Sequence, residues 1–179
     1  MTARPRILLG FTGSVASVKI PELVGLLSAF SEVRTVGTAK GCFFTNYAPS
    51  ETEETEWSFR KLGDPVHHIE LRRWADLFLI APLSANTLAK VAGGHCDNLL
   101  TSVARAWDFS KPLLVAPAMN TAMWNHPATA EQVQRLLSWQ IRVIEPESRQ
   151  LACMDIGMGA LASLPVIVHT VHDSLKLVP

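Results

Sequence analysis

Residues 77–87, with the sequence LFLIAPLSANT, decide the fold class. The first five, residues 77–81, form an uninterrupted apolar run, which is typical of a strand buried on both faces of a parallel sheet. Pro82 stops that run, and small polar residues then open a helix that continues through Val91 and closes at residues 93–94. A strand, a polar turn and a helix in this order are the repeating unit of an α/β protein.

The same unit recurs on both sides of this stretch. Strands are expected in the apolar runs 6–11, 33–36, 112–116 and 142–144. Helices are expected from about residue 15 to residue 30 and over 97–107, 129–139 and 165–178. Residues 39–68 are polar and poorly periodic and are expected to lack regular structure, and residues 150–164 are expected to form a loop or flap. Strands that alternate with helices predict an α/β fold with a parallel sheet covered on both faces.

The composition predicts one soluble domain over residues 1–179. The chain has 179 residues, of which 48% are hydrophobic and 18% are charged, and this content suffices for a sizeable core. Lys and Arg number 16, as do Asp and Glu, so a protein that grips nucleic-acid phosphates is disfavoured. The one run of like charge, residues 51–56 (ETEETE), is expected to be a solvated loop. No apolar stretch reaches about 18 residues, so no membrane span is expected.

The three cysteines, Cys42, Cys96 and Cys153, have no paired spacing and are expected to be reduced thiols, which fits a cytoplasmic protein. Cys153 lies in the glycine-containing segment, where a thiol can meet a ligand. A free cysteine within a helix or strand is usually a small buried hydrophobe instead. Residues 95–97 (HCD) have no second pair of ligands at zinc spacing, so no metal site is expected.

Ligands of such sheets bind where the strands end, so the residues after each strand are the candidates. After the first strand, Gly13 and Ser14 lie at an expected helix N-terminus, where free N–H groups attract a phosphate. The alternative is a tight turn in which Ser14 only caps the helix. The stretch has neither the G-x-G-x-x-G pattern nor the Gly-Lys-Ser/Thr of a Walker A loop, and no acidic residue ends the second strand. A dinucleotide is therefore disfavoured.

Polar side chains also follow the third and fourth strands. Ser84, Asn86 and Thr87 crowd one turn and could donate to a cofactor ring or a phosphate, although helix capping needs only one of them. Asn120 offers both a donor and an acceptor, so it could bind a ligand or form an Asx turn. His68 could act as a base or an acid near neutral pH, or be a surface or capping histidine.

Several stretches, taken together, resemble one known family. They are 13–16 (GSVA), 68–76 (HIELRRWAD), 81–90 (APLSANTLAK), 96–101 (CDNLLT), 117–124 (PAMNTAMW) and 151–153 (LAC). The likeness runs from about residue 6 to about residue 162, and its motifs are long and in the right order. The chain is similar to the homo-oligomeric flavin-containing cysteine decarboxylases, and the block 68–124 looks most like their coenzyme A branch.

The resemblance implies a flavodoxin-like or Rossmann-like three-layer sandwich that binds FMN and assembles as a trimer with flavin sites between subunits. It implies decarboxylation of 4'-phosphopantothenoylcysteine to 4'-phosphopantetheine in coenzyme A synthesis. In that chemistry the thiol-bearing carbon is oxidised, carbon dioxide leaves, and the product is reduced again, with the flavin carrying the redox step.

The resemblance also assigns roles by position. His68 matches the essential histidine, Cys153 the cysteine acid of the final reduction, and Asn120 the asparagine that binds the substrate carboxylate. Met123 and Ala152 are the other residues matched to substrate binding. The residues matched to flavin contacts are Gly13, Ser14, Val15, Thr38, Ser84, Asn86 and Thr87.

The sequence departs from the family in three places. Met154 stands where the family has glycine, and Ser163 where it has an acidic residue. Residues 37–41 replace part of the small hydroxyl residues usual near the phosphate. Two alternatives stay open: a flavin-binding regulatory relative of the phosphatase-inhibitor or salt-tolerance type with weak or no catalysis, and a decarboxylase of peptide C-terminal cysteines. The presence of His68, Asn120 and Cys153 favours the enzyme.

Overall fold

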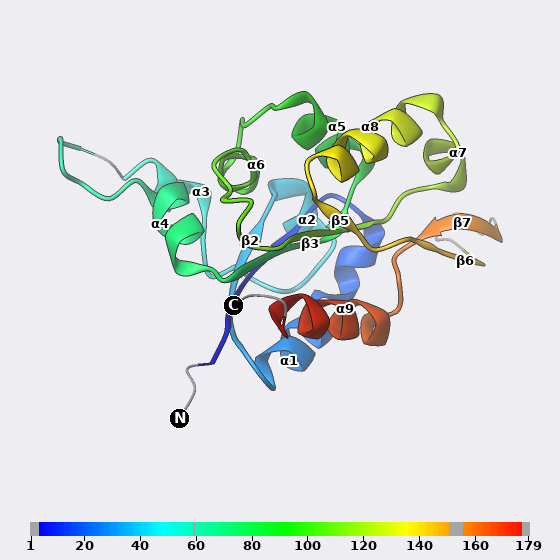
Figure 1. The fold of residues 1–179 in the computed structure, drawn as a ribbon, viewed down its shortest axis with the longest axis horizontal. Coiled ribbons are helices and arrows are strands. Elements are labelled where there is room, and N and C mark those ends of the chain that lie inside the picture. The colour runs from blue at the N-terminus through cyan, green and yellow to red at the C-terminus, as the bar shows by residue number, and fades with distance from the viewer. Residues whose placement is uncertain (1–3, 59, 151–155, 177–179) are drawn as a thin grey trace.

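The computed structural model describes residues 4–58, 60–150 and 156–176. Its centre is a sheet of five parallel strands in the order β2-β1-β3-β4-β5 (Figure 1). The strands are β1 (Arg6–Phe11), β2 (Glu32–Gly37), β3 (Leu77–Leu83), β4 (Leu113–Pro117) and β5 (Arg142–Val143). This is the flavodoxin-like strand order, in which the direction of winding reverses between β1 and β3. The predicted fold class is confirmed.

Helices cover both faces of the sheet (Figure 1). One face carries α1 (Ile20–Ser28), which follows the 3₁₀ helix η1 (Val15–Lys19), and α9 (Leu164–Lys176). The other face carries α5 (Ala85–Gly93), α6 (Leu99–Arg105) and α8 (Pro127–Ser138). The first helix is thus divided in two, and α8 begins two residues before the predicted start because Pro127 occupies its first turn.

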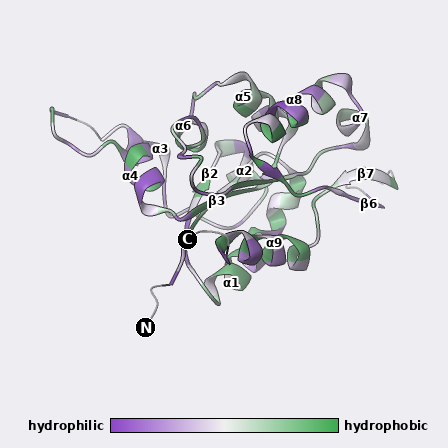
Figure 2. Ribbon diagram, viewed as in Figure 1, coloured by the Kyte–Doolittle hydropathy of each residue, from purple (hydrophilic) through white to green (hydrophobic). Residues whose placement is uncertain are grey.

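The alternation of side chains along each strand divides the core into two halves. In β1, Ile7 and Leu9 pack against α1 and α9, whereas Leu8 packs against the opposite helices. Phe78 and Ile80 of β3 join Leu8, and all of these side chains are fully buried. Figure 2 shows β3 as a hydrophobic strand through the middle of the molecule, while α8 carries hydrophilic and hydrophobic residues side by side. The apolar run of β3 also continues through Pro82 to Leu83, past the predicted end of the strand.

The segment before β3 differs from its prediction. It contains the short helices α2 (Ala39–Phe43) and α3 (Glu53–Glu56) and the N-terminal part of α4 (His67–Trp74), so the prediction that residues 39–68 lack regular structure is wrong. The prediction of a solvated loop for residues 51–56 is wrong as well. Glu53 Oε1 accepts a hydrogen bond of 2.7 Å from the backbone N–H of Leu99, the first residue of α6. Carboxylates are stabilised at helix N-termini, which explains why this acidic run folds against other helices.

The segment predicted as a loop or flap is partly a β-hairpin. Its strands are β6 (Glu147–Gln150) and β7 (Ile156–Ala160), and they pair antiparallel. The hairpin docks beside the short helix α7 (Thr121–Trp124) through a hydrogen bond of 2.9 Å from Met119 N–H to Gly159 O. Gly159 has φ of +126°, and a Cβ there would lie 2.3 Å from Met119 O, so only glycine fits this close approach.

Candidate functional site

A cavity of about 550 Å³ opens at the carboxyl ends of β1, β3 and β4. It lies where the winding of the sheet reverses, which is the place where ligands bind in open α/β sheets. Three groups of residues surround it: the turn after β1 with η1, the turn after β3, and the segment after β4 together with the hairpin. Its walls therefore come from segments that are far apart in the sequence, from Gly13 to Leu161.

The turn after β1 forms the first wall with Gly13, Ser14 and Val15. Ser14 caps η1, because its Oγ accepts a hydrogen bond of 3.3 Å from Ala16 N–H. Gly13 packs closely on α2, since a Cβ there would lie 2.7 Å from the Cβ of Lys40. Among the described residues, the backbone N–H groups of Gly13 and Val15 donate to no acceptor. Ser14 is therefore a cap, and the donors that remain at the cavity are compatible with the predicted phosphate contact.

The turn after β3 forms the second wall with Ser84, Ala85 and Asn86. Ser84 caps α5 by accepting a hydrogen bond of 3.3 Å from Thr87 N–H. Ala85 and Asn86 are the first two residues of α5, and their N–H groups have no acceptor within the described part of the chain. Two helix N-termini, those of η1 and α5, thus meet at one cavity, an arrangement that favours an anionic group.

Thr12, at the end of β1, joins these two turns. Its Oγ1 donates a hydrogen bond of 2.8 Å to Pro82 O and accepts one of 2.7 Å from Ser84 N–H. Thr12 is fully buried, so these bonds are shielded from water. No sequence pattern marks Thr12 as a functional residue. A hydroxyl residue between an apolar strand and a Gly-Ser turn is a weak signal, because its partner lies 72 residues away.

The third wall contains Met119, Asn120 and Met123 after β4 and the hairpin residues Arg149 and Gln150. Asn120 caps α7, since its Oδ1 accepts a hydrogen bond of 2.8 Å from Ala122 N–H. The Asx-turn interpretation of Asn120 and its place at a cavity are therefore compatible. Met123 is 49% exposed, which leaves its side chain able to contact a ligand.

Glu147 anchors the hairpin wall. Its carboxylate pairs with the Arg149 guanidinium and accepts a hydrogen bond of 2.6 Å from Ser163 N–H. The ion pair with Arg149, followed by that backbone hydrogen bond, lowers the pKa of Glu147 to about 2. An acidic group therefore lies beside Ser163, the position at which the resemblance led us to expect an acidic residue.

The structure brings together most of the residues singled out from the sequence. Those that line the cavity are Gly13, Ser14, Val15, Ser84, Asn86, Asn120 and Met123. Thr38 and Thr87 do not line it: Thr38 caps α2 by accepting a hydrogen bond of 3.1 Å from Gly41 N–H, and Thr87 is buried in the first turn of α5. Ala152 and Cys153 lie outside the described residues.

His68 lies far from this cavity within one chain. It is the second residue of α4, and α4 and α7 occupy opposite ends of the long axis of the molecule (Figure 1). Its Nδ1 is 2.5 Å from Glu56 Oε1, and its backbone N–H donates a hydrogen bond of 3.0 Å to Glu56 Oε2. His68 and Asn120 therefore cannot act on one small molecule within a single chain.

Two cationic residues that the sequence analysis missed also line the cavity, Lys19 and Arg149. Lys19 is the last residue of η1 and forms no ion pair within the described ranges. The sequence could have indicated Lys19, because it lies in the helix expected directly after Gly13 and Ser14. Arg149 lies in the polar strand β6, where no sequence pattern distinguishes it from its neighbours.

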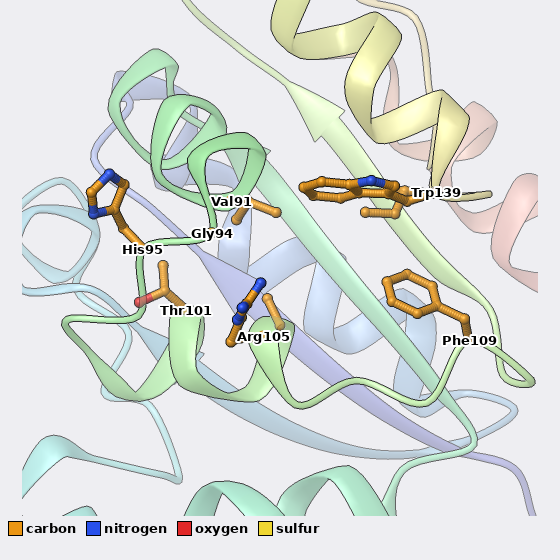
Figure 3. Close-up of a pocket in the computed structure, with 9 residues that line it drawn as sticks. Val91, Gly94, His95, Thr101, Arg105, Phe109 and Trp139 are labelled. Carbon is orange, nitrogen blue, oxygen red and sulfur yellow. The ribbon is translucent and has the colours of Figure 1, made fainter.

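A smaller cavity of about 190 Å³ lies between α5, α6 and α8, near the amino ends of β4 and β5 (Figure 3). Figure 3 shows Arg105 pointing upward below Val91, with the rings of Phe109 and Trp139 to its right, while His95 points away. No site residue predicted from the sequence lines this cavity. The larger cavity at the carboxyl ends of the strands is therefore the candidate site.

Residues 4–58, 60–150 and 156–176 contain no group of three or more His, Cys, Asp or Glu residues placed to hold a metal ion. In the same residues, no helix has the length and apolar character needed to cross a bilayer.

Comparison with known proteins identifies the family. The model of the Flavoprotein family matches residues 1–176, so the chain belongs to the Flavoprotein family. It is 52% identical over 180 residues to the probable phosphopantothenoylcysteine decarboxylase of Arabidopsis thaliana, with 96% of this chain and 89% of that protein covered. It is 51% identical over 180 residues to the phosphopantothenoylcysteine decarboxylase of Mus musculus, with 96% and 87% covered. The expected family is confirmed.

Solved structures agree with these relatives. A mutant PPC decarboxylase complexed with pantothenoylaminoethenethiol has a TM-score of 0.94 and 49% identity, and the match covers 97% of this chain and 99% of that one. The FMN-binding protein AtHal3 has a TM-score of 0.88 and 50% identity, with 94% and 95% covered. The chain thus shares its fold with a PPC decarboxylase and with an FMN-binding protein.

Proposed function

We propose that this protein is an FMN-dependent decarboxylase that converts 4'-phosphopantothenoylcysteine to 4'-phosphopantetheine and carbon dioxide in coenzyme A synthesis. The observation that carries this proposal is the cavity of about 550 Å³ at the reversal point of the sheet, where two helix N-termini meet Asn120 and Met123. The similarity to phosphopantothenoylcysteine decarboxylases over nearly the whole chain supports it. The regulatory alternative is not favoured.

The residues at the cavity fit FMN. The unpaired N–H groups of Val15, Ala85 and Asn86 and the cationic Lys19 offer donors and positive charge for its phosphate. Apolar surface for a flat ring comes from Val15 and Val18, which are 46% and 59% exposed, and from Met123. Exposed apolar side chains at the edge of a cavity are what a bound ring system would cover.

FMN, when bound, supplies a reversible two-electron oxidation of the thiol-bearing carbon, and that oxidation gives the developing carbanion an electron sink. The protein contributes placement and proton transfer. Asn120 would hold the substrate carboxylate through its side-chain amide, and Met123 would contact the substrate chain. His68 would take up the proton released on oxidation, and Cys153, outside the described residues, would return one in the final reduction. The net reaction consumes one proton and releases carbon dioxide, with the flavin unchanged.

The separation of His68 from Asn120 supports a homo-oligomeric assembly, which we propose is a trimer. A site that needs both side chains is completed when His68 of one copy faces Asn120 of another. Phe43 and Trp57 are 83% and 82% exposed, although large apolar side chains of this kind are usually covered, and both fit a contact between copies.

A cytoplasmic location and a single domain over residues 1–179 complete the proposal. Among the described residues, Cys42 and Cys96 are free thiols, as a reducing compartment favours. Cell fractionation and limited proteolysis test the two expectations directly.

The decisive experiment incubates the purified protein with FMN and 4'-phosphopantothenoylcysteine and follows the products by mass spectrometry. We expect a product lighter by one carbon dioxide, together with flavin absorbance that copurifies with the protein. A protein that binds no FMN, or that leaves the substrate intact, would refute the proposal.

A further inference from the structure

Glu56 makes two contacts with one residue, His68. Its Oε1 lies 2.5 Å from the imidazole Nδ1, and its Oε2 accepts a hydrogen bond of 3.0 Å from the backbone N–H of His68. The side chain of Glu56 is 14% exposed and that of His68 is 24% exposed, so both are largely withdrawn from water. One carboxylate therefore fixes both the ring and the backbone of the same histidine.

The chemistry of the two groups determines where the proton lies. An ionised carboxylate has no proton to donate, so the hydrogen between Glu56 and His68 belongs to Nδ1. The other ring nitrogen, Nε2, has no hydrogen-bond partner among the residues the structure describes. The pair thus leaves Nε2 as the atom that can accept and release a proton.

Further hydrogen bonds hold α3 and α4, the two helices that carry Glu56 and His68. Glu56 is the last residue of α3, and the first residue of α3, Glu53, is held by the N-terminus of α6 at 2.7 Å. At the other end of α4, Lys111 Nζ donates a hydrogen bond of 2.7 Å to Ala75 O. The N-cap residue of α4, Val66, has no side chain that can cap the helix, so Glu56 takes that role as well.

We propose that Glu56 is a positioning residue for the decarboxylation, which it serves by holding His68 in the Nδ1–H tautomer with Nε2 presented to the reacting substrate. This inference rests on the proposed function, in which His68 moves a proton. A carboxylate that orients a histidine in this manner also stabilises the imidazolium that forms when Nε2 takes up a proton. Glu56 itself does not line the cavity of its own chain.

The test compares Glu56→Gln and Glu56→Ala with the wild type, all loaded with FMN. A Gln side chain has one acceptor oxygen where the carboxylate has two, so it must either leave one N–H group of His68 unpaired or donate its own amide N–H to an unprotonated Nδ1. The second arrangement reverses the tautomer of the ring. We expect kcat to fall on the order of tenfold to a hundredfold with KM nearly unchanged, because substrate contacts stay in place. In protein with ¹⁵N-labelled histidine, we expect the His68 signals, assigned with His68→Asn, to show Nδ1–H in the wild type and a loss of that preference in the variants.

Glu51→Gln is the matched control. Glu51 lies in the same acidic run and its Oε2 is 3.0 Å from Nε2 of the neighbouring His67, so the variant removes the same charge beside the other histidine. We expect its kcat and the His68 spectrum to match the wild type. A wild-type spectrum without Nδ1–H, or a Glu56→Gln variant with normal kcat and bound FMN, would overturn the role of Glu56. If the wild type releases no carbon dioxide, the proposed function fails, and the spectrum still decides the Glu56 contact.

Discussion

Thr12 and Ser84 are joined by a hydrogen bond of 2.7 Å that runs from the backbone N–H of Ser84 to Oγ1 of Thr12, although 72 residues separate them. The same hydroxyl donates to Pro82 O at 2.8 Å. A single buried side chain therefore sets the spacing between the turn after β1 and the turn after β3. Both turns line the candidate flavin site, so the spacing is a property of the site as well as of the fold.

Replacing Thr12 by valine should loosen this connection. Valine has nearly the same shape but leaves the Ser84 N–H without its acceptor, and an unsatisfied buried donor costs about 1–3 kcal/mol. We expect a loss of that size in the free energy of unfolding, measured with urea, and a weaker affinity for FMN, measured by quenching of flavin fluorescence. Thr12→Ser keeps the hydroxyl and should retain most of both. Equal FMN affinity in Thr12→Val and the wild type would contradict the prediction.

The ion pair between Arg6 and Asp76 should make stability depend on pH. Its shortest contact, from an Arg6 terminal nitrogen to Asp76 Oδ1, is 2.9 Å, and it ties the start of β1 to the residue before β3. Burial acts to raise the pKa of Asp76, but hydrogen bonds from the Arg6 side chain and backbone outweigh it and hold the pKa below its ordinary 3.8. A lowered folded-state pKa stabilises the folded protein above the ordinary value, and that contribution disappears as the pH falls through the folded-state pKa.

The measurement compares the free energy of unfolding of Asp76→Asn and the wild type between about pH 6 and about pH 2. We expect the variant to be less stable at the upper end and the difference to shrink toward the lower end. Glu70→Gln is the control, because the Glu70–Arg73 pair is exposed and should contribute little at any pH. A difference that stays constant down to pH 2 would show that the charge of Asp76 is not the cause.

Gly159→Ala should detach the hairpin from the site. The new Cβ would lie 2.3 Å from Met119 O, and the backbone at φ of +126° is one that alanine rarely adopts. We expect faster hydrogen exchange of the β7 amides, weaker FMN binding and lower turnover. Gly25→Ala is the control: apart from the backbone of its own helix and its chain neighbours, nothing lies within 4 Å of the added Cβ, and alanine in a helix should add about 0.5–1 kcal/mol of stability.

Mixing two inactive variants tests whether the site lies between copies. His68→Asn and Asn120→Asp should each bind FMN and each lack decarboxylation, because each removes one half of every site. When the two are coexpressed, an interface that takes His68 from one copy and Asn120 from another contains both native residues. We therefore expect partial activity in the mixture, measured as carbon dioxide release. If light scattering gives a monomer, or if the mixture stays inactive, the assembly proposal is wrong.

The sequence predicts the strands well because Gly or Pro bounds most of their apolar runs, as Gly37 at the end of β2 and Pro117 at the end of β4 illustrate. It predicts the hairpin poorly, because β6 (ESRQ) is polar and β7 (IGMGA) is rich in glycine, and their pairing depends on docking against Met119. The prediction for the acidic run 51–56 is wrong for a similar reason. The carboxylates of Glu53 and Glu56 accept hydrogen bonds from the backbone N–H groups of Leu99 and His68, which lie outside the run, and no local pattern marks such partners.

The place of α9 has a consequence for synthesis of the chain on the ribosome. Ile167 and Val171 of α9 cover one face of the sheet, including Leu9 and Leu79, and they are among the last described residues to be made. Until they emerge, that face of a nascent sheet stays exposed to water and prone to association. The hairpin that walls the cavity precedes α9 by only a few residues. The wall of the cavity that the hairpin supplies is therefore synthesised after the turns that follow β1 and β3, so a nascent chain that carries only those turns lacks part of the proposed cofactor site.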